Sequence, residues 1–211
     1  MKLRWIEFAL LYVGAPLFLA VGQASSLRVK IPIIPALIVI TIAVLLLLRR
    51  DKNFEFAEFV RVRTVPRREW LWMLARFAIA STILTVWLWH IRPDALLLFP
   101  KERPHFWLLV MCCYPIFSVM AQGVIYRALY WRRYSCLFPE EYKIIAGAAV
   151  FAFAHLPYAN VYALVFTFAG GLVFLSTYRR TRSNMFASIE HALFGDFLFT
   201  IGWGNFFFHG R

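Results

Sequence analysis

Hydrogen-bonding and ionisable side chains occur inside long apolar stretches in the second half of this 211-residue chain. Six of them could serve one reaction: Gln122, Arg127, His155, Glu190, His191 and Asp196. A neutral imidazole can hold a water molecule or a metal ion, and a nearby carboxylate can act as a general base. Two histidines from different helices, together with a carboxylate, would suit the activation of water. The set therefore predicts hydrolysis, provided that the fold brings its members together.

Five of these side chains also have a purely structural interpretation. An ionisable group at the centre of a membrane helix costs about 2.5–3.5 kcal/mol on insertion scales. Arg127 could reach from a helix end towards the lipid headgroups, and His155 could be an interfacial residue. Glu190, His191 and Asp196 could form a polar network that pins helices together. Because adjacent helix positions point about 100° apart, at least one of Glu190 and His191 must face the protein interior.

The chain lacks the short motifs of several other classes of protein. No GxSxG, HExxH, P-loop or GxGxxG pattern occurs, so serine hydrolases, zincins and nucleotide-binding enzymes are not indicated. Cys112, Cys113 and Cys136 form no CxxC pair. The net charge of +12 could suit nucleic acid, but the basic residues flank apolar segments, as in loops that face anionic lipid. We predict membrane lipid as a partner and no nucleic acid.

Apolar segments of membrane-spanning length must position these side chains. Hydrophobic residues make up 62% of the chain, against roughly 45–50% in soluble domains. A run of ~18 or more apolar residues can cross a bilayer. We predict an all-α fold, a polytopic membrane helix bundle of about seven transmembrane helices. The predicted spans cover residues 4–22, 31–48, 69–91, 105–128, 142–156, 159–178 and 184–207.

Basic residues predict the orientation of these spans. With a cytoplasmic N-terminus, 16 Lys and Arg residues lie in inside segments and 6 in outside segments, as the positive-inside rule requires. We predict an integral protein of the plasma (inner) membrane, with its C-terminus outside. Lys2 and Arg4, followed by an apolar run and residues 22–24, also fit a signal peptide, although Glu7 favours retention. The loop 49–68 is either a membrane-surface segment or a solvated connector.

Several motifs occur in a fixed order on successive spans. Phe151 and His155 are separated by three residues, and His191 begins a similar spacing on the last span. The other stretches are Tyr126-Arg127, Trp131–Tyr134, Gly170-Gly171, Tyr178–Thr181 and Glu190–Asp196. Together they resemble the CPBP (ABI) family, the CAAX-processing and bacteriocin-processing intramembrane endopeptidases. The resemblance covers roughly residues 110–208.

This resemblance implies an enzyme that cleaves peptide bonds at the membrane. The implied partner is a peptide or protein substrate, which is lipid-modified for part of the family. The first family motif is a Glu pair, three residues and Arg, and one of its glutamates is thought to activate water. Two histidines with an Asn or Asp assist the oxyanion. The histidines correspond to His155 and His191 here. No cofactor is certain, and a divalent metal such as zinc is the candidate.

The chain departs from the family pattern where the acid is expected. The first motif is a Glu pair, three residues and Arg, but the pair reads Gln122-Gly123 before Arg127. Glutamine cannot accept a proton from water, and losing a positioned base typically costs ~10²–10⁴-fold in rate. The third motif ends in Asn or Asp, where Gly195 stands, with Asp196 one residue later. Glu190 or Asp196 could substitute or could orient the histidines.

Three functions remain open at this point. The first is a CAAX-type endopeptidase with weakened catalysis, and the second is a non-catalytic pseudoprotease that acts as a membrane scaffold or peptide-binding chaperone. The third is a transporter, since intramembrane charges mark transport pathways. We predict one membrane domain, with three N-terminal spans in residues 1–104 and a CPBP-like core in residues 105–211. A cavity should bring Gln122, His155 and His191 together, with the imidazoles within ~12 Å.

Overall fold

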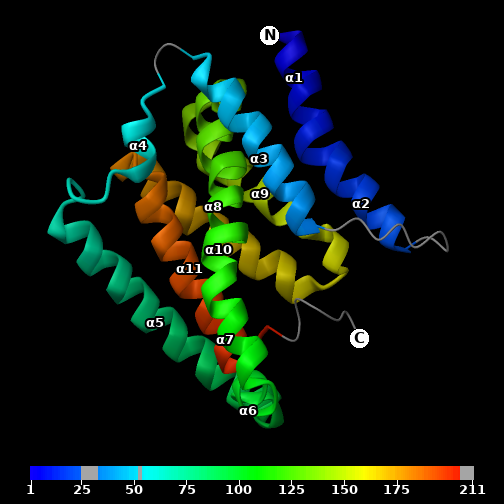
Figure 1. Ribbon diagram of the computed structural model, residues 1–211, viewed down its shortest axis with the longest axis vertical. Helices are drawn as coiled ribbons and strands as arrows, with labels where there is room; N and C mark the ends of the chain where they lie inside the picture. The colour runs from blue at the N-terminus through cyan, green and yellow to red at the C-terminus, as the bar shows by residue number, and fades with distance from the viewer. Residues whose placement is uncertain (25–32, 52–53, 205–211) are drawn as a thin grey trace.

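The fold is shown in Figure 1 as a computed structural model, which describes residues 1–24, 33–51 and 54–204. Every regular element of these residues is helical, which confirms the all-α prediction. Parts of two predicted spans, residues 31–32 and 205–207, lie outside the described residues. So do four of the basic residues that predicted the orientation: Arg28, Lys30, Lys52 and Arg211.

The chain consists of α-helices joined or interrupted by short π and 3₁₀ segments. The α-helices are α1 (Lys2–Ala9), α2 (Ala15–Ala24), α3 (Ile33–Arg49), α4 (Phe56–Val60), α5 (Arg67–Ile91), α6 (Leu98–Glu102), α7 (Pro104–Cys113), α8 (Met120–Gly123), α9 (Lys143–Phe153), α10 (Val161–Thr181) and α11 (Asn184–Ile201). The π segments are η1 (Leu10–Gly14), η3 (Tyr114–Val119) and η4 (Val124–Tyr134), and the 3₁₀ turns are η2 (Pro93–Ala95), η5 (Ser135–Leu137), η6 (Glu140–Tyr142) and η7 (Leu156–Tyr158).

Four helical segments of the described residues are long and apolar enough to cross a membrane. They are Lys2–Gly22, Arg67–Ile91, Pro104–Leu137 and Val161–Thr181. The apolar helix Pro35–Arg49 is shorter than these. α9 has only 11 residues, about 16 Å of helix, whereas the hydrocarbon core is about 30 Å thick. The count of about seven spans is therefore not confirmed.

The end of α9 differs from the sequence-based expectation in a way that concerns the site. The span was predicted to run through His155, but α9 ends at Phe153 and His155 stands just before the 3₁₀ turn η7. Pro157 explains the break, because it lacks an N–H and disfavours helical backbone at the residue before it. His155 therefore lies in a short connection rather than inside a helix.

The N-terminal helix packs into the main core. Phe8 and Tyr12 are buried there, and the Tyr12 hydroxyl donates to the carbonyl of Ile125 at 2.7 Å. Arg133 binds the Glu7 carboxylate, with Nε 2.9 Å from Oε2. This ion pair accounts for the acidic residue in an apolar helix. Figure 1 shows α1 and α2 (blue) along one side of the bundle and α5 (teal) along the other, with α11 and the α7–η4 segment between them.

α9 and α10 approach each other closely at a glycine. A Cβ atom at Gly171 would lie 2.9 Å from the Cα atom of Ala148, so only glycine permits this spacing. The close contact sets α10, with its inward-facing Phe174, against the helix that carries Phe151. The packing of these two helices thus fixes the aromatic surroundings of the histidines.

Candidate active site

Phe151 of α9 stands between the two histidines. The centroid of its ring lies 5.0 Å from that of His155 and 5.5 Å from that of His191, edge to face in both cases. The two imidazoles are therefore closer together than the ~12 Å set for groups that share one water molecule. His155 lies in the connection after α9 and His191 in the middle of α11, so the fold brings together residues far apart in sequence.

His155 is oriented by the backbone of the helix that precedes it. Its Nδ1 atom lies 2.8 Å from the carbonyl oxygen of Phe151, one of the carbonyls left without a partner at a helix end. A carbonyl oxygen only accepts, so Nδ1 carries the proton and Nε2 of the neutral ring keeps a lone pair. His155 therefore presents a potential proton acceptor at Nε2.

His191 is buried and held on three sides. Its ring stacks on Phe174, with centroids 4.5 Å apart and planes inclined by 20°. Nδ1 lies 3.5 Å from Nη1 of Arg127, a long contact, and Nε2 lies 3.2 Å from the hydroxyl of Tyr114. Because a guanidinium only donates, Nδ1 is the acceptor and Nε2–H of the neutral ring donates to Tyr114.

Arg127 points into the protein rather than towards lipid headgroups. Its side chain is buried, with Nε donating to Asn184 Oδ1 at 3.1 Å and Nη2 to Ser188 Oγ at 2.5 Å. The interpretation of Arg127 as a residue reaching to the membrane surface is therefore wrong. Within the described residues it forms no ion pair, so its charge faces neutral partners next to His191.

Gly123 provides the space that Arg127 occupies. A Cβ atom at this position would overlap Nη2 of Arg127 and would lie 2.7 Å from Asn184 Oδ1. The two residues are four apart, so they stack along one face of the helix, as the spacing predicts. Gly123 stands where the family motif has its second glutamate. Because it has no side chain, the Arg127 guanidinium can lie in this space.

Gln122 does not hydrogen-bond to either histidine among the described residues. Its Nε2 donates to Ser118 Oγ at 2.7 Å, and its Oε1 is buried without a partner. A buried amide oxygen without a donor is costly, so it is a natural contact for an incoming N–H or water. The predicted cavity that would unite Gln122 with both imidazoles stays a prediction.

The two carboxylates of α11 have different surroundings, and neither forms a hydrogen bond with a histidine of the part of the chain that the structure describes. Glu190 is fully buried and accepts from Nε of Arg76 at 3.0 Å. Asp196 has one buried oxygen, Oδ1, without a partner. Arg127 thus contacts His191 directly, and Phe151 contacts both His191 and His155. Glu190 instead points towards Arg76 of α5.

Sequence reasoning missed several residues of this site. Asn184 and Ser188 precede His191 at helical spacing on α11, so the periodicity of that helix could have indicated them. Tyr114 had no comparable signal, because it lies 77 residues before His191 in the sequence. Arg76 had one signal, a basic residue in the interior of a predicted apolar span.

A divalent metal at this site stays a prediction. No group of three or more His, Cys, Asp or Glu side chains gathers in this part of the chain. A catalytic zinc ion requires three protein ligands, and His155 and His191 supply only two.

The comparisons with known proteins agree with the motif pattern. Residues 103–195 match the family model described as Type II CAAX prenyl endopeptidase Rce1-like. No curated protein and no solved structure matches the chain. The matched segment begins near the predicted boundary at residue 105 and contains both histidines and Arg127. Residues 103–195 of this integral membrane protein are therefore similar to the Rce1-like CAAX endopeptidases, a family of intramembrane proteases.

Proposed function

We propose that the chain is an intramembrane endopeptidase of the CAAX-processing type in which His155 acts as the general base. The hydrogen bond from His155 Nδ1 to the Phe151 carbonyl carries this proposal. It leaves Nε2 able to accept a proton in a site without a carboxylate at positions 122 and 123. A neutral imidazole is a suitable base near pH 7.

The reaction is hydrolysis of a peptide bond. A water molecule next to His155 gives a proton to Nε2 while its oxygen bonds to the carbonyl carbon of the substrate. The carbonyl oxygen becomes an oxyanion, and the positive charge of Arg127 next to His191 favours it. The C–N bond then breaks, and the protonated His155 returns its proton to the leaving nitrogen. This cycle restores the neutral imidazole.

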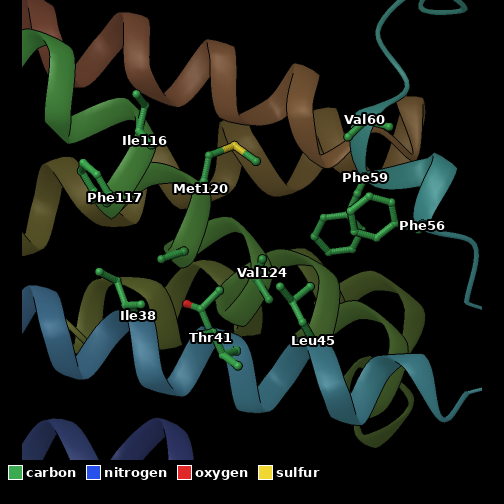
Figure 2. A pocket seen from close by; sticks show the side chains of 12 residues that line it. Ile38, Thr41, Leu45, Phe56, Phe59, Val60, Ile116, Phe117, Met120 and Val124 are labelled. Atoms are coloured by element: carbon green, nitrogen blue, oxygen red, sulfur yellow. The ribbon is translucent and has the colours of Figure 1, made fainter.

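An apolar groove offers a place for the non-peptide part of a substrate. It has a volume of about 240 Å³ and lies between α3, α4 and the η3–α8 segment. Figure 2 shows Thr41 and Leu45 of α3 facing Met120 and Val124, with Phe56 of α4 at one end. Met120 lies on the same short helix as Gln122. We propose that the groove holds the lipid chain of a lipid-modified peptide.

A pseudoprotease is the second candidate, and a specific observation favours it. The Arg127 guanidinium fills the space that a glutamate side chain at position 123 would need. The site is therefore adapted to the absence of that acid. A protein of this kind would bind peptides as a membrane scaffold or chaperone without cleaving them.

Cleavage by the full chain reconstituted in liposomes separates the two functions. The substrates are a prenylated CAAX peptide and a leader peptide, and the variants are the native chain and Gln122→Glu. Turnover by the native chain supports the endopeptidase. Turnover by Gln122→Glu alone supports the pseudoprotease, because the new carboxylate supplies the missing base. Gly123→Glu is a poor variant for this purpose, since its side chain would displace Arg127.

A further inference from the structure

The Tyr114 hydroxyl occupies the space that a side chain at position 195 would need. A Cβ atom at Gly195 would overlap the hydroxyl and would lie 2.7 Å from Cζ of Tyr114. Gly195 lies one helical turn after His191, on the same face of α11. The absence of a side chain at Gly195 therefore lets a tyrosine from another helix reach this histidine.

Tyr114 is held firmly in this position. Its ring lies edge to face against His191, with centroids 6.1 Å apart, and against Phe199, with centroids 5.1 Å apart. Its hydroxyl lies 3.2 Å from Nε2 of His191. Tyr114 begins the π segment η3, where Pro115 removes a backbone N–H. A π turn of this kind is frequent at functional sites.

The direction of the hydrogen bonds leaves the tyrosine proton available. Arg127 can only donate to Nδ1 of His191, so Nε2–H of the neutral ring donates to the Tyr114 oxygen. The O–H of Tyr114 makes no other hydrogen bond among the described residues. A phenol donor beside the histidine pair can therefore turn towards a substrate oxygen.

We propose that Tyr114 positions His191 and donates its O–H to the oxyanion, with Gly195 admitting it to the site. This inference rests on the proposed hydrolysis. The chain has no side chain at position 195 to supply a donor, and the tyrosine supplies one from the space left by the glycine.

The test compares Tyr114→Phe, Gly195→Ala and the double variant in the full reconstituted chain. Tyr114→Phe should lower kcat by ~10²–10³-fold, as loss of one oxyanion donor does, and leave KM nearly unchanged. Gly195→Ala should lower kcat because its Cβ displaces the hydroxyl. The double variant should be no worse than the poorer single variant, since both changes remove one interaction. Tyr142→Phe, at an exposed tyrosine, is the matched control.

A readout without turnover keeps the inference separate from the proposed function. The ¹⁵N resonance of His191 Nε2, measured in histidine-labelled protein in detergent, should shift in Tyr114→Phe and stay unchanged in Tyr142→Phe. Native kcat with an unchanged resonance in Tyr114→Phe would overturn the proposal, and so would multiplicative losses in the double variant. A native chain without turnover would refute the hydrolase and the donor role, and the resonance would then decide whether Tyr114 positions His191.

Discussion

Arg76 of α5 binds Glu190 of α11 with two of its nitrogens on the same carboxylate oxygen, Nε at 3.0 Å and Nη2 at 2.5 Å. Nη2 of Arg76 also lies 3.3 Å from the hydroxyl of Thr177 on α10. One arginine thus connects three helices immediately before His191. These contacts agree with the interpretation of Glu190 as part of a polar network that holds helices together.

Removal of Arg76 should destabilise the protein strongly. Arg76→Met leaves Glu190, which has no exposed surface, without its cation, and breaking a buried pair in this way costs roughly 3–5 kcal/mol. The thermal midpoint in detergent should therefore fall by several degrees. Arg76→Met combined with Glu190→Leu should recover most of the loss, because no buried charge is left. A native midpoint in Arg76→Met alone would show that the pair does not hold the helices.

Any side chain at position 123 should disrupt the surroundings of Arg127. Gly123→Ala places a methyl group on the guanidinium and should separate it from Asn184 and Ser188. Loss of buried hydrogen bonds to a charged group should cost about 1.5–3 kcal/mol each. Thermal unfolding measures this, and Gly22→Ala is the control, because a Cβ there meets nothing within 4 Å. Equal stability of both variants would contradict the packing of Arg127 over Gly123.

A bulky residue in the apolar groove should affect lipid-modified substrates selectively. Met120→Trp fills the space between α3 and α8 that Figure 2 shows. The KM for a prenylated peptide should rise about tenfold, which corresponds to a loss of about 1.4 kcal/mol of binding free energy. The KM for the same peptide without its lipid should not change. Ile79→Trp, on an exposed face of α5, is the control. An equal effect on both peptides would refute the groove as the lipid site.

Local spacing predicted the parts of the site that lie on one helix. The pairs Gly123 with Arg127 and Phe151 with His155 follow from residues four apart, and both pairs are in contact. Hydropathy predicted the long apolar helices but not the short α9, whose end depends on Pro157. It also could not show that Arg76 and Glu190, 114 residues apart, would neutralise each other.

The remaining parts of the site arise only in the folded chain. Tyr114 reaches His191 because α11 carries a glycine at position 195, a condition that neither helix reveals alone. The acid missing from positions 122 and 123 was evident from the sequence. The tautomer that makes His155 a candidate base was not, since it depends on the carbonyl at the end of α9.

The most direct test of the account is the single-turnover cleavage rate of a prenylated CAAX peptide by His155→Gln in liposomes. Glutamine keeps a side chain that can hydrogen-bond but cannot take a proton from water, so the rate should fall by at least ~10²-fold from that of the native chain. His105→Gln, at an exposed histidine of α7, should keep the native rate. A native rate in His155→Gln would contradict the assignment of His155 as the base.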